Sequence, residues 1–468
     1  MQRLSGLDAS FLYLETAAQP LHVCSILELD TSTMPGGYSF ARFRDLLAER
    51  IRAMPEFRER LADNRFNLDH PVWVDDPDFD VDRHLHRMGL PSPGGPRELA
   101  DICGHIASLP LDRTRPLWEM WVIENLGGAP GGDDGERIAV MTKVHHAAVD
   151  GVTGANLMSK LCTTEPDAPA PEPVAGPGGG SDLEIAVSGA VRFVSRPLGL
   201  VNAVPNTLTS VIDTVRRVRS GMTMAPPFVA PKTAFNANVT GHRNVAFAHL
   251  DLDDVKTVKN HFGVKVNDVV MALVSGVLRT FLLDRGELPN NSLVAMVPVS
   301  VHEKSDRPGR NQVSGMFARL ETNIADPVER LEAIAEANTV AKQHSSAIAA
   351  TLLQDWTQFA APAVFGAAMR VYASSRLSGA RPVHNLVVSN VPGPQGRLYM
   401  LGCGVEAMYP LGPIFHGSGL NITVMSLSGN LDVGIVSCPE LVPDLWDMAD
   451  DFAVAMKELL NAVERATK

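Results

Sequence analysis

A segment rich in proline and glycine, residues 163–182, divides the chain into two parts. Its sequence, TTEPDAPAPEPVAGPGGGSD, adds acidic residues and has no apolar periodicity, which is the composition of a linker. The chain has 468 residues, more than one hydrophobic core usually supports. We therefore expect two domains, residues 1–162 and 236–468, joined by a linker and an amphipathic helical connector over residues 163–235.

Composition narrows the class of protein. Apolar residues make up 45% of the chain and charged residues 20%, as in a globular protein, so a disordered or collagen-like chain is excluded. The net charge of −12 argues against nucleic acid as a partner, because binding to phosphates needs clustered Lys and Arg. The five cysteines are far apart and form no Cys-x-x-Cys pair, so we expect neither a zinc ribbon nor disulfides, and a cytoplasmic location.

The chain is expected to touch a membrane without crossing it. No stretch is apolar over the ~20 residues that a span needs, and Asp8 and Glu15 interrupt any secretory signal at the start. Residues 183–221 repeat apolar side chains every three or four positions, and their main charges are arginines. This pattern fits a helix on an anionic lipid surface. It also fits a connector that packs its apolar face on the protein, as most amphipathic helices do.

Helical and strand patterns occur in both parts. Residues 40–61 carry apolar residues at helical spacing, whereas residues 138–146 form a short, partly β-branched run typical of a strand. Residues 266–286 predict a strongly apolar helix with Asn267 as its N-cap. Two further apolar runs predict buried strands, residues 292–301 and 384–394. The pattern predicts an α/β fold with two domains of similar size.

Residues 143–151, KVHHAAVDG, carry the clearest chemical signal. The expected strand ends at His145 and His146, and residues 151–161 then predict a helix with Asp150 at or before its first turn. Neighbouring side chains of a strand face opposite sides, so only one of the two histidines can easily reach a shared substrate. The small residues that follow leave room beside an imidazole.

Three interpretations of this stretch stay open on the residues alone. A metal site would need more ligands, yet the other histidines show no ligand-spaced cluster with a carboxylate, and we expect no metal. A structural histidine pair is the second interpretation, with Asp150 as a helix cap. The third is a general base with an orienting partner, since an imidazole of pKa ~6.5 suits proton removal near neutral pH.

The sequence shows no protein nucleophile for an acyl-enzyme. There is no Gly-x-Ser-x-Gly elbow, and no cysteine lies in a motif that would activate it. We therefore expect direct transfer, in which a histidine deprotonates an acceptor that attacks an activated acyl donor.

The stretch HHAAVDG resembles the His-His-x-x-x-Asp-Gly signature of the coenzyme A-dependent acyltransferase superfamily, which includes chloramphenicol acetyltransferase, plant alcohol acyltransferases and peptide-synthetase condensation domains. Other stretches, spread over nearly the whole chain, resemble the bacterial wax ester synthase / acyl-CoA:diacylglycerol acyltransferase family. They are residues 4–16, 115–126, 266–282, 297–301 and 388–394.

The resemblance implies two similar chloramphenicol-acetyltransferase-like α/β domains, each a mixed sheet with helices, around a central tunnel. It implies transfer of a fatty acyl group from acyl-CoA to diacylglycerol, giving triacylglycerol, and to long-chain alcohols, giving wax esters. Acyl-CoA is then a substrate, and no cofactor is expected. The enzyme would sit in the cytoplasm, peripherally bound to the inner membrane or to lipid droplets.

The resemblance also assigns roles to residues. It makes His146 the general base, His145 auxiliary, and Asp150 a structural aspartate that pairs with an arginine which the sequence does not identify. Asn267 falls on an Asn-Asp motif near the active site, although a plain helix cap explains it nearly as well. The remaining candidates are expected to bind substrate: Gly151, Pro116, Leu117, Trp118, Asp268, Ser389 and Asn390.

Some of these candidates have simpler explanations. Trp118 is typical of a buried aromatic anchor. Residues 389–394, SNVPGP, fit an ordinary turn at a strand end, with two prolines and a glycine. Ser389 or Asn390 would instead donate hydrogen bonds to the developing oxyanion if the strand end lines the tunnel.

Three other functions compete with this interpretation of the sequence. The alternative within the superfamily is a condensation-type acyltransferase that uses carrier-bound substrates, but no carrier domain is evident. A glycerophosphate acyltransferase uses His-x-x-x-x-Asp, which His145 and Asp150 satisfy, yet its Glu-Gly-Thr-Arg motif is absent from the sequence. A lipid-binding protein without activity would not need the histidines.

Overall fold

The computed structural model describes residues 2–62, 69–127, 137–148, 160–176, 178, 184, 185, 187, 229–300, 313–344 and 382–467. The elements before the connector are β1 (Gln2–Arg3), α1 (Gly6–Leu14), β2 (His22–Asp30), α2 (Phe40–Ile51), β3 (Glu59–Ala62), β4 (Val72–Asp75), β5 (Leu85–Gly89), α3 (Pro96–Ser108), β6 (Trp118–Glu124), β7 (Arg137–His145) and β8 (Cys162–Thr163).

The elements after the connector are β9 (Asn244–Asp251), α6 (Leu252–Phe262), α7 (Val266–Asp284), β10 (Val294–Ser300), β11 (Val313–Arg319), α8 (Pro327–His344), β12 (Leu386–Pro392), β13 (Tyr399–Met400), β14 (Cys403–Leu411), β15 (Leu420–Leu427), β16 (Asn430–Ser437) and α12 (Leu445–Thr467).

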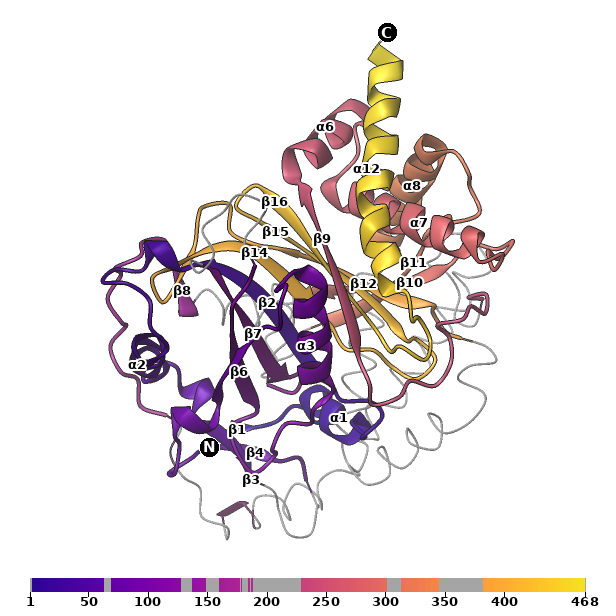
Figure 1. Cartoon of the computed structure of the whole chain (residues 1–468). Helices are drawn as coiled ribbons and strands as arrows, with labels where there is room; N and C mark the ends of the chain where they lie inside the picture. The colour runs from indigo at the N-terminus through magenta and orange to yellow at the C-terminus, as the bar shows by residue number, and fades with distance from the viewer. Residues whose placement is uncertain are drawn as a thin grey trace.

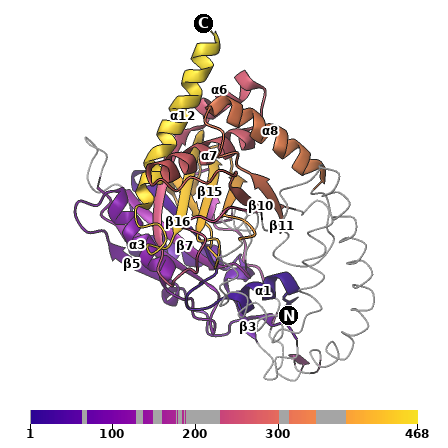
Figure 2. The same ribbon diagram turned by 90° about the vertical axis from the view of Figure 1, so that its right-hand side faces the viewer.

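Two large mixed sheets organise the molecule. A seven-stranded sheet has the order β5-β6-β7-β2-β14-β13-β8, and a six-stranded sheet has the order β11-β10-β12-β15-β16-β9. Figure 1 shows α6, α7, α8 and α12 together at the end of the molecule from which the C terminus projects, with α1 at the opposite end. The turned view in Figure 2 shows the same separation. The predicted α/β class, with two regions of sheet and helices, is confirmed.

The seven-stranded sheet is buried on both faces, which explains its apolar strands. In β2, Leu27 and Leu29 face a core with α1 and α2, whereas Ile26 faces a second core. That second core includes residues of α3, and also Phe247 of β9, so it joins the two halves. A strand with side chains of both faces in a core needs apolar residues at successive positions, as β2 and β7 have.

The N-terminal sheet includes a strand from the C-terminal half. Strand β14 pairs antiparallel with β2 along Cys403–Leu411, and a bulge interrupts the pairing between Val405 and Ala407. Strand β13 then pairs with β8, so Cys162, the last residue of the predicted first domain, and Thr163, the first residue of the predicted linker, form the edge strand of this sheet. The predicted domain boundaries at 162/163 and 235/236 stay predictions.

Several predicted elements are observed with shifted bounds. The strand expected at 138–146 is β7, and the apolar helix expected at 266–286 is α7. The helix expected over residues 40–61 is wrong beyond Ile51: α2 ends there, Pro55 begins a 3-10 turn, and the chain then enters β3. Residues 151–159 of the helix predicted at 151–161, and most of the connector at 183–221, lie outside the described residues.

Asn267 is not the N-cap of α7, which corrects the prediction. The helix begins one residue earlier, at Val266, with Lys265 as its N-cap, and the carboxylate of Asp268 accepts the Lys265 N–H at 3.0 Å. In the described part of the chain, α7 is the one helix long and apolar enough to span a membrane, but 72% of its apolar window is buried in the protein. It is the central helix of the C-terminal core.

Candidate active site

The end of β7 presents the histidine pair, and two neighbouring segments fix its backbone. His145 N–H donates to the Leu117 carbonyl at 3.0 Å, and His146 N–H donates to the Leu21 carbonyl at 2.9 Å. A turn follows, closed by Ala148 N–H and the His145 carbonyl at 2.8 Å. The two histidines are therefore held from opposite sides, by the start of β6 and by the start of β2.

His145 is fully buried and makes structural contacts. Its Nδ1 accepts the N–H of Ala147 at 3.0 Å, so a ring proton lies on Nε2. Nε2 lies 3.4 Å from Oε2 of Glu15. The ring thus braces the turn on one side and contacts a carboxylate on the other.

Glu15 is the centre of this arrangement, and the sequence interpretation missed its role. Its Oε1 accepts the Leu21 N–H at 3.1 Å and lies 3.2 Å from Nε2 of His22, while its Oε2 accepts from Arg113 Nε at 3.1 Å. Burial alone would raise the pKa of Glu15, but the nearby ring nitrogens of His145 and His22 and the hydrogen bond from Arg113 outweigh it and hold the pKa well below its usual range. Glu15 is therefore an ionised carboxylate, and both of its oxygens contact polar groups.

His22 lies opposite His145 on the paired strand and was not a candidate. Burial lowers its pKa; Glu15 acts in the opposite direction, and the positive charge of Lys143 adds to the lowering. Lys143 is fully buried, and its amine donates to the Ile106 carbonyl at 3.2 Å and contacts Glu119 at 3.1 Å. His22 is thus held as a neutral imidazole.

His146 differs from His145 in being partly exposed. Its ring stacks on that of Phe11 from α1, with centroids 3.9 Å apart and planes 15° apart. Of the two histidines, only His146 is thus partly accessible to solvent, which fits the expected inequality. The role of His146 as a general base stays a prediction.

The Pro-Leu-Trp stretch supports the histidines from within the core. All three residues, Pro116 to Trp118, are buried. The indole N–H of Trp118 donates to the Phe57 carbonyl at 2.8 Å, and its ring stacks on His84 with centroids 4.6 Å apart. Trp118 is 3% exposed, so it acts as an internal anchor here; contact between substrate and Trp118, Leu117 or Pro116 stays a prediction.

The Asn-Asp stretch of α7 meets the end of β12. The amide of Asn390 donates to Oδ1 of Asn267 at 3.3 Å, and both residues are partly exposed. Asp268 is buried and accepts the amide of Asn338 in α8 at 2.9 Å, so it ties two helices together. Ser389 is paired with Thr423 of β15 along the sheet. The structure thus brings Asn267 and Asn390 together, while the predicted oxyanion role stays a prediction.

Asp150 and Gly151 lie outside the described residues, so the expected pairing of Asp150 with an arginine stays a prediction. No group of three or more His, Cys, Asp or Glu side chains in the described part of the chain is placed to hold a metal ion.

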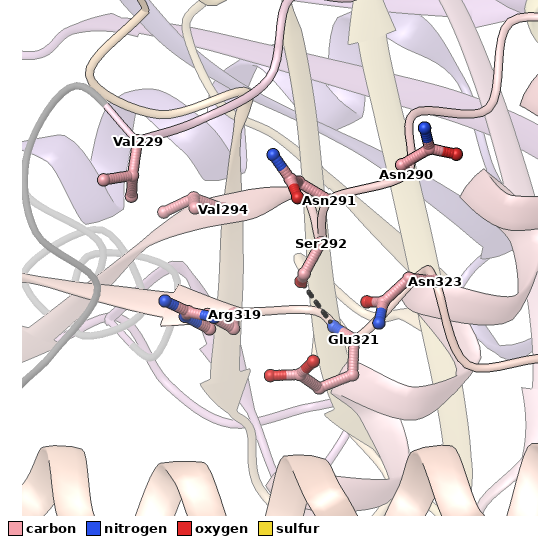
Figure 3. A pocket seen from close by; sticks show the side chains of 8 residues that line it. All are labelled: Val229, Asn290, Asn291, Ser292, Val294, Arg319, Glu321 and Asn323. Carbon is pink, nitrogen blue, oxygen red and sulfur yellow. Dashed lines mark hydrogen bonds between the residues drawn. The ribbon is translucent and has the colours of Figure 1, made fainter.

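A hollow of about 280 Å³ lies at the other end of the C-terminal sheet, between the loop before β10 and the end of β11 (Figure 3). Asparagines 290, 291 and 323, together with Arg319 and Glu321, make its wall polar. Ser292 accepts the Glu321 N–H across it at 2.8 Å. An acyl chain needs apolar walls, so this hollow does not suit one.

Fold and site together define a class of protein: an α/β acyltransferase of two sheet-and-helix halves with a histidine pair at the end of a central strand. A condensation domain of the calcium-dependent antibiotic synthetase has the same fold, with a TM-score of 0.58, coverage of 98% of this chain and 96% of that chain, and 17% identity. At that identity the likeness shows the fold alone.

The family follows from closer comparisons. Residues 4–270 match the model of the wax ester synthase/diacylglycerol acyltransferase catalytic domain, and residues 310–460 match the C-terminal domain of the same family. The chain belongs to this family and is an acyltransferase.

Individual relatives agree. Rv1760 of Mycobacterium tuberculosis H37Rv, named as a diacylglycerol O-acyltransferase, is 59% identical over 461 residues, 98% of this chain and 90% of the relative. The relative tgs2 of the same strain, named likewise, is 34% identical over 97% of this chain and 98% of its own. The solved wax ester synthase/diacylglycerol acyltransferase of Marinobacter aquaeolei VT8 has a TM-score of 0.72 and 27% identity, over 99% of this chain and 100% of that one.

Proposed function

We propose that this acyltransferase moves a fatty acyl group from acyl-CoA to the free hydroxyl of diacylglycerol, forming triacylglycerol, and that long-chain alcohols are alternative acceptors that give wax esters. The observation that carries the proposal is the partly exposed His146, fixed at a strand end beside a fully buried His145. The names of the relatives support the choice of acceptor.

The reaction is a single transfer in this proposal. His146 takes the proton of the acceptor hydroxyl, whose oxygen forms a bond to the thioester carbonyl carbon. The C–S bond then breaks, and the imidazolium returns the proton to the thiolate of coenzyme A. Asn267 and Asn390 are the polar groups that we assign to the developing oxyanion, because their amides meet at the end of β12.

A condensation-type reaction with carrier-bound substrates is the alternative, and the fold alone does not separate the two. Membership of the wax ester synthase/diacylglycerol acyltransferase family favours acyl-CoA. Under the alternative, a carrier-bound acyl group would be a far better donor than acyl-CoA. A transfer assay that compares the two donors measures this difference.

The deciding experiment is transfer from labelled palmitoyl-CoA to diacylglycerol or hexadecanol, with the lipid products resolved. We expect product with the unchanged protein and a loss of ~10²- to 10⁴-fold for His146→Ala in folded protein. His145→Ala should lose less. A near-normal His146→Ala together with an inactive His145→Ala would overturn the assignment of the base.

Direct transfer has its own test. After mixing with palmitoyl-CoA alone, the intact mass of the protein should be unchanged. A stable acyl adduct on a serine or cysteine would replace direct transfer by an acyl-enzyme route.

We also propose that the enzyme works in the cytoplasm at the inner membrane or lipid-droplet surface, where both lipid substrates are found. The basic amphipathic connector, residues 183–221, is the segment that we assign to binding. Flotation on anionic liposomes should weaken when Arg216, Arg217 and Arg219 become serine. Equal flotation of both proteins would instead favour a connector packed on the protein.

A further inference from the structure

The end of α1 reaches His146 at two points. Phe11 and Glu15 lie four residues apart, joined by the bond from Glu15 N–H to the Phe11 carbonyl at 3.1 Å, so they share one face of the helix end. Glu15 accepts the Leu21 N–H, and the Leu21 carbonyl accepts the His146 N–H. The same helix turn therefore holds the backbone of His146 through Leu21 and the ring of His146 through Phe11.

The contact between the two rings is close and nearly parallel. Centroids lie 3.9 Å apart, and the planes differ by 15°. Neutral aromatic rings prefer offset or edge-to-face contact with centroids about 4.5–7 Å apart. A cation over the face of a phenyl ring, in contrast, is attracted by the negative charge of that face, and more strongly where water is excluded. The contact between the two rings is therefore more favourable when the imidazole is charged.

The charged and titratable groups around this strand end are engaged with one another. They come from α1, β2, β7 and the loop before β6: Glu15, His22, Lys143, His145 and Arg113. Their charges form a fixed background in which Glu15 is negative and Lys143 and Arg113 are positive. Phe11 is the described group whose ring face meets the imidazole itself.

We propose that Phe11 is a positioning residue for the catalytic base, one that orients the imidazole of His146 and stabilises the imidazolium while the acceptor proton is on the ring. This inference rests on the proposed role of His146. It predicts that the aromatic ring at position 11 affects the rate of acyl transfer and the pH dependence of that rate, although Phe11 has no titratable group.

The main variant is Phe11→Leu, which keeps an apolar side chain and removes the ring face. We expect kcat/KM to fall about 3- to 30-fold, with KM for palmitoyl-CoA little changed. Loss of the ring disfavours the imidazolium, so the acid limb of the pH–rate profile should move to lower pH, by about 0.5–1 unit. Phe11→Tyr retains the ring and should restore both.

Phe79→Leu is the matched control. Phe79 also stacks on a histidine, His84, with centroids 5.5 Å apart and planes 24° apart, but His84 is not a member of the histidine pair. Its loss should leave the pH–rate profile unchanged. If Phe11→Leu fails to fold, pentafluorophenylalanine at position 11 keeps the ring shape, reverses the charge of its face, and should give the same shift.

A direct titration separates this inference from the proposed function. The imidazole of His146 is followed by NMR and assigned by its absence in His146→Ala; its pKa should be lower in Phe11→Leu than in the unchanged protein, whether or not the enzyme transfers acyl groups. An unchanged or higher pKa would overturn the role of Phe11. If the pKa of His146 shifts as expected but the protein transfers no acyl group, the role of Phe11 is supported and only the proposed function is overturned.

Discussion

Each half of the molecule contains a carboxylate that meets histidine, and the two clusters behave in opposite ways. In the N-terminal half, Glu15 contacts His22 and His145, whose side chains are 2% and 0% exposed. In the C-terminal half, Asp432 of β16 accepts from Nδ1 of His249 at 2.6 Å, and the His249 side chain is 46% exposed. Both carboxylates are buried or nearly so, but the histidines differ in access to water.

The difference appears in the direction of the pKa shifts. Burial lowers the pKa of His22, with the positive charge of Lys143 adding to it. The hydrogen bond to Asp432 raises the pKa of His249, because water still reaches the ring and burial costs less. A carboxylate beside a histidine therefore does not by itself produce a charged pair. The N-terminal cluster keeps the ring of His22 neutral, whereas the C-terminal cluster forms an ion pair that depends on pH.

The largest effect is expected from Glu15→Ala. It leaves the N–H of Leu21 without its acceptor, at a cost of about 1–3 kcal/mol, and it removes the carboxylate that lies beside His22 and His145 and pairs with Arg113. We expect the free energy of unfolding to fall by about 3 kcal/mol or more, with loss of acyl transfer. Urea unfolding followed by circular dichroism measures it. Glu15→Gln should lose less, and unchanged stability of Glu15→Ala would show that the cluster does not hold the strand end.

The second largest effect is expected from Asp432→Ala, which removes the corresponding carboxylate in the C-terminal half. Asp432 accepts the Met408 N–H at 2.8 Å, just after the bulge in β14, and this donor would be left buried without an acceptor. We expect a loss of about 1–3 kcal/mol in unfolding free energy and unchanged turnover per folded molecule. Loss of turnover without loss of stability would mean that this cluster also serves the reaction.

His22 is expected to have a smaller effect, a loss of folding stability at acidic pH. Its pKa is lower in the folded protein than in the unfolded chain, so the unfolded chain binds the proton more readily and stability is lost as pH falls below about 6.5. One histidine contributes at most about 1.4 kcal/mol per pH unit. His22→Gln retains a donor for Glu15 and should reduce the loss between pH 7.5 and 5.5. The same slope in both proteins would contradict the neutral assignment.

The smallest effect is expected for His249, with the opposite sign. Its pKa is raised in the folded protein, so its contribution is complete below about pH 6.5 and is lost as pH rises through the folded value. Because the ring is half exposed, we expect less than about 1 kcal/mol. Unfolding of His249→Gln between pH 6 and 8 should lack this decline. A decline as large as in the unchanged protein would assign it to other groups.

The fold was predictable where the signal is local. Long apolar runs predicted α7 and the strands β7, β10 and β12. The prediction failed where neighbouring residues compete: Pro55 ends the helical region after Ile51, and Lys265 takes the cap that Asn267 was expected to form. The pairing of β14 with β2 joins residues almost 400 positions apart, and no local pattern indicates it.

The site divides in the same way. His145 and His146 were found because their motif is contiguous. In the sequence, Glu15 was used only to exclude a secretory signal. Its role in the site was not predicted, because its partners come from three other segments of the chain. A polar residue directly after the apolar helix, and a histidine at the first position of β2, were the available signals for Glu15 and His22. Phe11 gave no signal, because a phenylalanine in an apolar helix is typical of any core.

The pairing of β14 with β2 has a consequence for synthesis of the chain. The ribosome delivers the histidine pair early, but residues 403–411, which close the edge of that sheet, emerge only near the end. Until then β2 presents an unpaired edge, the feature by which nascent chains associate with one another. A fragment that ends at residue 270 contains the whole catalytic motif, yet it keeps that edge open, so it should be recovered in aggregates or bound to chaperones. Supplying the missing strand as a separate peptide should restore solubility.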